Sequence, residues 1–309
     1  MLKCISCGHG LPETFNTIAC PKCSNDEIHN WLYSTNLKSF AFPASPFSST
    51  VRDRQKGLAN QDFVWLKRED KNPLSGTFKD RKTALLTQYH PSPCNRTFTL
   101  ASSGNMAISF SKIWSSNKKR YIDTYLWVSP YIDLKKLRTL CECYTKINFT
   151  EKILSTAELT MGEADRWNIT NGMDPIGASA YYSLGLELEP YNFDNIIVPC
   201  GSGELYSALA VYFQLLRKRM YPRIIPVTSN LPEADAIKTS FVASQPFIDF
   251  FEKYYNDSFE GIEIIDDAEK LKYYSNIYNC EYSSAVVFAA YEQLKPAGRT
   301  CLIVTGAKR

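Results

Sequence analysis

Short apolar runs alternate with helical patterns from about residue 60 to the end of the chain. Six runs have the length and the β-branched or aromatic content of strands: 63–66, 97–100, 125–128, 195–198, 224–227 and 301–304. Apolar residues recur at helical spacing from Leu205 to Met220, and Asp266 or Asp267 is expected to cap a helix that runs to about residue 278. Strands separated by helices predict an α/β fold whose parallel sheet is covered on both faces.

The size and composition of the chain agree with a globular protein of more than one lobe. A length of 309 residues exceeds what one compact core usually organises, so two lobes and a small appendage are expected. The formal net charge of +3 is too small to indicate a nucleic-acid partner, and the basic runs at 118–120 and 217–219 are typical of solvated surfaces. Because no apolar run approaches the roughly 18 residues of a membrane span, and the first residues do not resemble a signal peptide, we expect a cytoplasmic protein without membrane contact.

Cysteine pairs set the first 25 residues apart. Cys4 and Cys7 form one Cys-x-x-Cys pair, and Cys20 and Cys23 form a second. Each pair fits a tight turn that directs two thiolates to one point, and two such turns complete a tetrahedral zinc site. A redox role or a fortuitous arrangement is the alternative. The pattern predicts a structural zinc ribbon, because four cysteines leave no coordination position for a substrate.

Histidine is scarce, and this excludes several kinds of chemistry. The chain has only His9, His29 and His90, so nothing after residue 90 can act as a histidine base. A Ser-His-Asp triad or a histidine-rich metal centre in the main body is therefore excluded.

Lysine is a candidate for the chemistry of the main body. In a parallel sheet, ligands bind beyond the carboxyl ends of strands, so the residues after each predicted strand are the ones of interest. The first such segment contains Lys79, close to where a helix is expected to start near Thr77. The helix dipole disfavours a charge in the first turn, and a nucleophilic lysine must be neutral to form an imine. Taken alone, a lysine among charged neighbours is more often a surface residue.

Three further segments follow predicted strands and contain groups that can bind anions. The first is Ser102, Ser103, Gly104, Asn105 and Met106, and the second is Gly201, Ser202, Gly203, Glu204 and Leu205. Each opens a helix, where main-chain N–H groups suit a carboxylate or a phosphate. The second is neither a Walker loop nor the dinucleotide fingerprint, because the required lysine and third glycine are missing. Thr305 follows the last strand. Each segment alone matches many ordinary strand-to-helix turns.

The order of these segments resembles the fold-type II pyridoxal-phosphate (PLP) enzymes, and threonine synthase most of all. Relatives in that group carry Asn-Pro-x-Gly-Ser-Phe-Lys-Asp-Arg, an asparagine loop, a glycine loop and a terminal Leu-Thr-Gly-x-Gly-x-Lys. The segment 281–285, Glu-Tyr-Ser-Ser-Ala, is similar to their Glu-Pro-Ser-Ser-Ala. The resemblance covers residues 60–308, and several threonine synthase relatives also begin with a cysteine ribbon.

The resemblance implies an architecture and roles for individual residues. It implies a tryptophan synthase β-like fold with a zinc ribbon over 1–30, a large PLP-binding lobe over 31–95 and 155–309, and a small mobile lobe over 96–154. Lys79 is implied to bind the cofactor and move the α-proton, Asn105 to bond the ring hydroxyl, and Thr305 to face the pyridine nitrogen. The loop at 201–205 is implied to hold the phosphate, and residues 102–106 the carboxylate of an amino-acid substrate. A homodimer is usual in that family.

The sequence departs from the family pattern at several positions. Glu204 replaces a usual Gly, Ala or Asn, Leu74 a usual Thr, and Thr77 a usual Ser. The terminus lacks the second glycine of Thr-Gly-x-Gly. A carboxylate beside a phosphate repels it unless the carboxylate turns away or binds a donor.

Three functional interpretations follow. The first is a threonine-synthase-like carbon–oxygen lyase that converts O-phosphohomoserine to threonine, with Lys67, Arg81 and Arg166 as candidate cations for the second phosphate. The second is β-elimination or β-replacement on Ser, Thr, O-phosphoserine or a cysteine precursor. The third is a catalytically degenerate PLP-fold protein that binds a partner through its ribbon.

Overall fold

The chain folds into α/β units built on parallel sheets. The computed structural model describes residues 2–4, 7, 9–11, 22, 31–33, 50–51, 64–88, 97–116, 124–144, 146–151, 166–172, 174–217, 222–238, 245, 248–249, 253 and 261–308. Two compact units contain the chain: a first unit of residues 1–42 and 79–180, and a second unit of residues 43–78 and 181–309. Within the described residues, no helix is both long and apolar enough to cross a membrane.

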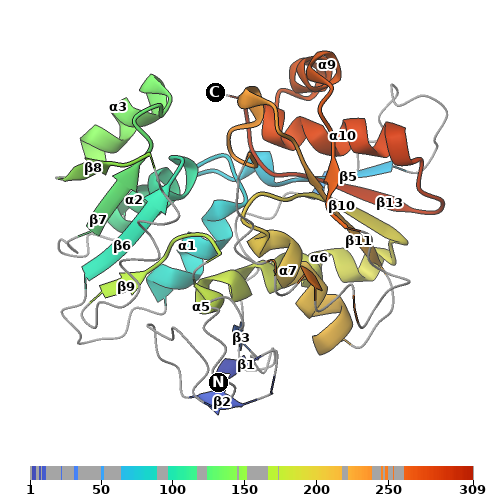
Figure 1. Ribbon diagram of the computed structural model, residues 1–309, viewed down its shortest axis with the longest axis horizontal. Helices are drawn as coiled ribbons and strands as arrows, with labels where there is room; N and C mark the ends of the chain where they lie inside the picture. Colours follow the sequence, from blue (N-terminus) through green and yellow to red (C-terminus); the bar gives the residue numbers. More distant parts are fainter. Residues whose placement is uncertain are drawn as a thin grey trace. The chain divides into compact units, whose positions relative to one another are not determined.

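The first unit contains a four-stranded parallel sheet in the order β8-β7-β6-β9 (Figure 1). Its strands are β6 (Thr97–Ser102), β7 (Thr124–Val128), β8 (Ile147–Phe149) and β9 (Arg166–Asn168). Its helices are α1 (Lys79–Gln88), α2 (Asn105–Ser116), α3 (Leu134–Cys143) and α5 (Pro175–Ala178). Apolar side chains of α2 pack on Phe98, Leu100 and Leu126 of the sheet, together with Leu86 of α1 and Leu140 of α3.

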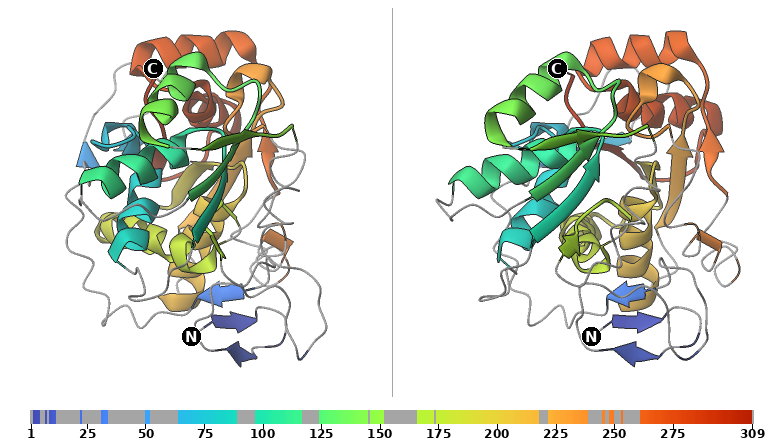
Figure 2. Two further views of the ribbon diagram at one scale, coloured as in Figure 1. Left: turned by 90° about the vertical axis from the view of Figure 1, so that its left-hand side faces the viewer. Right: turned by 60° about the vertical axis from the view of Figure 1, so that its left-hand side comes forward.

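Three short strands near the start of the chain form a separate antiparallel sheet. They are β1 (Leu2–Cys4), β2 (Gly10–Leu11) and β3 (Trp31–Tyr33), with β1 in the centre (dark blue beside the label N in Figure 2).

The second unit contains a six-stranded sheet in the order β12-β11-β10-β13-β5-β4, parallel except for the edge strand β4. Its strands are β4 (Thr50–Val51), β5 (Val64–Arg68), β10 (Asn195–Pro199), β11 (Arg223–Thr228), β12 (Glu263–Ile264) and β13 (Thr300–Val304). Its α-helices are α6 (Tyr182–Leu188), α7 (Glu204–Ala210), α9 (Ala268–Tyr278) and α10 (Tyr282–Leu294), and a π-helical segment (Val211–Leu216) continues α7. In Figure 1, α9 and α10 lie on one side of the sheet, and α6 and α7 on the other.

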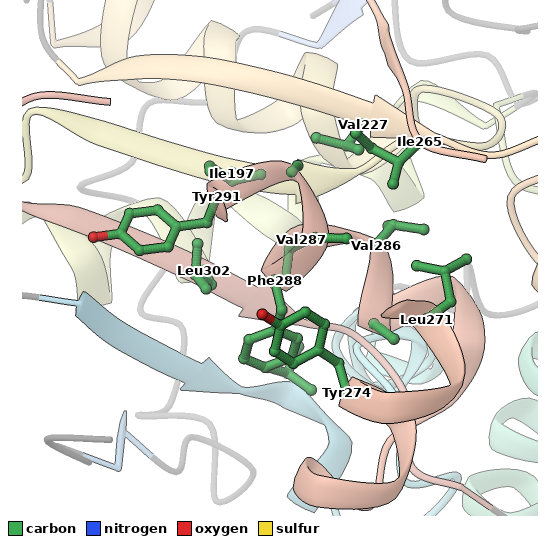
Figure 3. Packing of buried hydrophobic residues seen from close by; sticks show 14 of the residues in the cluster. Ile197, Val227, Ile265, Leu271, Tyr274, Val286, Val287, Phe288, Tyr291 and Leu302 are labelled. Carbon is green, nitrogen blue, oxygen red and sulfur yellow. The ribbon is translucent and has the colours of Figure 1, made fainter. Parts of the chain in front are cut away.

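The core of the second unit is organised by α10. Every residue from Ser283 to Tyr291 is buried, as expected for a helix that is apolar on all sides. Val286, Val287 and Phe288 pack against residues of the sheet and of α9 (Figure 3). The rings of Phe288 and Tyr278 stack, with centroids 3.9 Å apart and planes 2° apart. This packing fixes the sheet whose strand ends carry the predicted ligand loops.

The predicted α/β class with parallel sheets is confirmed. In the first unit β9 pairs with β6, and α1 packs on α2. Residues 79–88 and 166–180 therefore belong to the unit of the smaller sheet rather than with the larger one. The assignment of a large cofactor-binding lobe and a small mobile lobe stays a prediction.

Candidate active site

Three loops meet at one edge of the second unit's sheet. β10, β13 and β5 are adjacent and parallel, so their carboxyl ends lie at the same edge. The residues that follow these ends are 200–203, 305–308 and 69–78. The sheet thus brings the predicted glycine loop and Thr305 to neighbouring strand ends, as ligand binding in α/β folds requires.

The loop after β10, Gly201 to Gly203, has a backbone that only glycine fits well. A Cβ atom on Gly201 would lie 2.9 Å from the Ala236 carbonyl oxygen and 3.0 Å from the Ile237 Cα, both of them backbone atoms. Gly203 has φ +81° and caps α7. The N–H groups of Gly201, Ser202 and Gly203 donate to no group in the described part of the chain. The loop therefore presents main-chain donors at a helix start, which fits a phosphate.

The two residues after this loop are both part of α7. Glu204 is its first residue and Leu205 its second, and each has 3% of its surface exposed. Glu204 also has at least one interaction within the fold. Leu205 offers only its backbone N–H to a ligand, because its side chain belongs to the core.

Thr305 lies in a hydroxyl pair with Ser284 of α10. Their oxygens are 3.0 Å apart, and the Ser284 Oγ also accepts from the Gly306 N–H at 2.8 Å. Thr305 is 6% exposed and Ser284 is fully buried. Glu281, just before α10, packs so closely on Gly306 that a Cβ there would lie 2.5 Å from its Oε2. A hydroxyl held this way can donate to or accept from a ring nitrogen.

The segment before Lys79 is fixed to the end of β13. The Phe78 N–H donates to the Thr305 carbonyl at 3.0 Å, and the Ala307 N–H donates to the Gly76 carbonyl at 2.9 Å. Gly76 has φ +61°, which its turn requires. Asn72 closes the turn from inside through its Nδ2, which donates to the Thr77 carbonyl at 3.1 Å. Lys79 follows Phe78 directly and is the first residue of α1, close to the predicted start of the helix.

The predicted asparagine loop, Ser102 to Met106, joins β6 to α2 in the first unit. The Gly104 N–H donates to the Ser102 Oγ at 3.0 Å, and Asn105 begins α2. Gly104 has φ +118°, and a Cβ there would lie 3.0 Å from the Cδ of Lys136. The side chain of Lys136 therefore runs across this loop. The arrangement presents hydroxyls and helix-start N–H groups, which suit a carboxylate.

The three candidate cations for a second substrate phosphate differ in their surroundings. Lys67 is fully buried, and its Nζ lies 2.6 Å from Glu187 and 3.6 Å from Glu69. This pairing disagrees with a role for Lys67 in binding a substrate. Arg81 is 3% exposed and also interacts within the fold. Arg166 begins β9, and its side chain lies outside the described residues.

The first pair of predicted zinc ligands is partly described. Cys4 ends β1 and is buried, whereas Cys7 is exposed. The Cys4 N–H donates to the His9 carbonyl at 2.9 Å and so closes a turn that contains Cys7. Cys20 and Cys23 lie outside the described residues, and among the residues that are described no cluster of His, Cys, Asp or Glu could hold a metal. The zinc site stays a prediction.

Cys200 directly precedes the glycine loop but is not a nucleophile. Burial raises its pKa to about 12, and burial likewise raises the pKa values of Cys280 and Cys301 to about 12. Thiol reagents attack the thiolate. We therefore expect iodoacetamide at pH 8 to label the exposed Cys141 and Cys143 in the native protein, and to label the three buried thiols only after unfolding. Peptide mass spectrometry checks this, and rapid native labelling of Cys200 would contradict the burial argument.

Some site residues were not found from the sequence. The sequence places Ser284 only within a segment of family resemblance, and its strand-end pattern does not include Thr83 or Ser109. Thr83 lies four residues after Lys79, and Ser109 four residues after Asn105. A spacing of four residues puts Thr83 on the same helix face as Lys79, and Ser109 on the same face as Asn105. This spacing is the sequence signal that identifies Thr83 and Ser109 as candidates.

Comparisons with known proteins find one family model and several similar solved structures. A family model described as pyridoxal-phosphate dependent enzyme matches residues 51–306. No curated protein matches the sequence. Among solved structures, an O-acetylserine dependent cystathionine β-synthase from Helicobacter pylori has a TM-score of 0.68 at 19% identity, covering 86% of this chain and 94% of that one.

Two further solved structures are similar. A cysteine synthase from Entamoeba histolytica has a TM-score of 0.64 at 16% identity, covering 90% of each chain. A threonine deaminase isoform 2 from Solanum lycopersicum has a TM-score of 0.63 at 15% identity, covering 86% of each chain. At such identities the likeness establishes the fold, which is the predicted fold-type II.

Proposed function

Because the chain belongs to the family of pyridoxal-phosphate dependent enzymes, we propose that it catalyses elimination or replacement at the β or γ carbon of a small amino acid. The single observation that carries the proposal is the meeting of the glycine loop, Thr305 and the segment leading to Lys79 at one sheet edge. When bound, PLP supplies an electron sink for cleavage of bonds at the substrate α-carbon.

Each group of site residues has its own role in this proposal. Main-chain N–H groups of Gly201–Gly203 and the α7 start would hold the cofactor phosphate, and the Lys79 amine would hold the cofactor and move the α-proton. Thr305 would bond the ring nitrogen, and Asn105 the ring hydroxyl. Because the Thr305 hydroxyl is neutral, it would not enforce protonation of that nitrogen, and this would favour elimination and replacement over transamination. Residues 102–106 bind the substrate carboxylate.

Two substrate classes compete. The motif order supports a threonine-synthase-like lyase acting on O-phosphohomoserine. The engagement of Lys67 by Glu187 and Glu69 favours the second candidate, β-elimination or β-replacement on Ser, Thr, O-phosphoserine or a cysteine precursor. That candidate needs no second cation for a γ-phosphate when the leaving group is uncharged. The solved relatives named for cysteine synthesis and threonine deamination belong to this second class.

A substrate panel tests the proposal. The reconstituted enzyme is incubated with O-phosphohomoserine, Ser, Thr, O-phosphoserine and O-acetylserine with sulfide. Phosphate release with threonine formation supports the first candidate, whereas pyruvate, 2-oxobutyrate or cysteine supports the second. If PLP is bound but nothing in the panel is turned over, the degenerate binding scaffold becomes the better interpretation. Absence of PLP binding would overturn the proposal as a whole.

We also propose that Cys4, Cys7, Cys20 and Cys23 hold one structural zinc ion. The support is the spacing of the two pairs and the turn that the Cys4 N–H and the His9 carbonyl close around Cys7. We expect metal analysis of the purified protein to find one zinc per chain, and Cys7→Ser to lose it. Cys141→Ser, a change at an exposed cysteine outside the pairs, is the control and keeps the zinc. A metal-free wild type with full stability would contradict the site. Homodimer assembly stays a prediction from family resemblance, and cytoplasmic location stays a prediction from the sequence pattern.

A further inference from the structure

A chain of buried hydrogen bonds joins the first turns of α1 and α2 within the first unit. The Ser109 hydroxyl of α2 donates to the Asp80 Oδ1 of α1 at 2.6 Å and lies 2.9 Å from the Thr83 Oγ1. The Thr83 hydroxyl has one proton, which it can donate either to the Ser109 Oγ or to the Lys79 carbonyl, whose oxygen lies 3.1 Å away. Asp80, Thr83 and Ser109 are all fully buried. Because all three side chains are buried, this network constrains the geometry of the two helix starts.

The chemistry of the groups orders the bonds. An ionised carboxylate only accepts, and a hydroxyl has one proton. The shorter contact of Ser109, to the carboxylate, is charge-assisted and is therefore the stronger of its two. Thr83 also lies 3.7 Å from the Met106 sulfur, in the predicted asparagine loop. The connected groups thus extend from the backbone of Lys79 to Met106, the residue after Asn105.

Helical geometry explains why the hydroxyls of Thr83 and Ser109 lie close to the starts of their helices. Side chains on a helix point back toward its N-terminus. Thr83 is one turn after Lys79, the first residue of α1, and Ser109 is one turn after Asn105, the first residue of α2. Each hydroxyl therefore lies beside the first turn of its own helix, which begins at Lys79 in α1 and at Asn105 in α2.

We propose that Ser109 is a positioning residue, which with Asp80 and Thr83 fixes the backbone of Lys79 relative to Asn105 for reaction with the cofactor. This inference rests on the proposed function. In this proposal Asp80, which belongs to the Lys-Asp-Arg motif, anchors α2 by accepting from Ser109. Removing the Ser109 hydroxyl removes this bond between the two helices and allows the two helix starts to shift.

The test separates cofactor binding from reaction with Lys79. In Ser109→Ala we expect the rate of covalent attachment of PLP to Lys79, trapped by borohydride, to fall roughly tenfold to 100-fold, as for a small misplacement of reacting groups. The dissociation constant of 4-deoxypyridoxine phosphate, which lacks the aldehyde, stays unchanged. Ser111→Ala is the matched control, because Ser111 is buried on the same helix and, among the described residues, its hydroxyl bonds only the Ile108 carbonyl.

Thr83 supplies a second, independent pair of variants. Thr83→Val keeps the shape and removes the hydroxyl, so the attachment rate falls, whereas Thr83→Ser keeps the hydroxyl and the rate. Without any cofactor, hydrogen exchange of amides near 79–84 and 105–110 accelerates in Ser109→Ala and not in Ser111→Ala. Attachment rates equal to those of Ser111→Ala would overturn the inference. A wild type that attaches no PLP at Lys79 would instead overturn the proposed function.

Discussion

Replacing Lys79 by Ala is expected to abolish covalent attachment of PLP and to reduce turnover by about 10²–10⁴-fold from the loss of proton transfer alone. Lys79 is the first residue of α1, a helix of ten residues, where the dipole disfavours an ammonium charge and so favours the neutral amine. The preceding residue, Phe78, is bonded to the end of β13, so the start of the helix is fixed. Absorbance of the bound cofactor, its bleaching by borohydride and the mass of the labelled peptide measure the effect.

The control for this change is Lys71→Ala. Lys71 lies in the same connecting segment, and 48% of its side chain is exposed. We expect it to bind PLP and to turn over substrate like the wild type. If the borohydride-labelled peptide of Lys79→Ala carried the cofactor on another lysine with activity retained, the assignment of Lys79 would be wrong. If neither of the two variants nor the wild type bound the cofactor, the interpretation as a degenerate scaffold would be favoured.

The long strands could be predicted from the sequence, because buried strands of a parallel sheet are continuous apolar runs. The strands Val64–Arg68, Asn195–Pro199 and Thr300–Val304 begin and end within two residues of the apolar runs 63–66, 195–198 and 301–304. The two-residue strand β12 and the three-residue strand β9, Arg166–Asn168, were missed. They are too short and too polar for a periodicity to appear, and only pairing with a neighbouring strand defines them.

The helix after the glycine loop was predicted in one piece. The structure has an α-helical part, Glu204–Ala210, and a π-helical part, Val211–Leu216. The change begins beside Tyr212, whose ring packs on Gly185 and whose hydroxyl donates to Glu189 at 2.7 Å. These contacts come from α6 and the turn after it, so the local pattern of apolar residues does not contain them.

The candidate site likewise has parts that the sequence predicts and parts that it does not. Its loops could be predicted, because they follow strands and open helices. Side-chain partners could not, since they come from distant parts of the chain: Lys67 pairs with Glu187, 120 residues away, and Thr305 with Ser284, 21 residues away. The pairing of Lys67 changes the functional conclusion, because it removes a cation that the phosphohomoserine reading needed.

The glycine loop leads to the second large effect. In Gly201→Val we expect the affinity for PLP to fall on the order of 100-fold, because overpacking of this kind costs about 1–3 kcal/mol and here displaces the phosphate donors directly. The new side chain meets the backbone of Ala236 and Ile237, at 2.9 and 3.0 Å from its Cβ, so the loop must move. Equilibrium titration of the free protein with PLP measures the change.

Pyridoxal, the cofactor without its phosphate, distinguishes this effect from general unfolding. If residues 201–203 hold the phosphate, the wild type prefers PLP to pyridoxal, and Gly201→Val loses that preference while its affinity for pyridoxal stays nearly constant. Ser202→Ala is the matched control, because it changes the same loop and keeps every main-chain N–H group. Equal loss of affinity for PLP and pyridoxal in Gly201→Val would place the phosphate elsewhere, because the loop would then contribute to folding and not to anion binding.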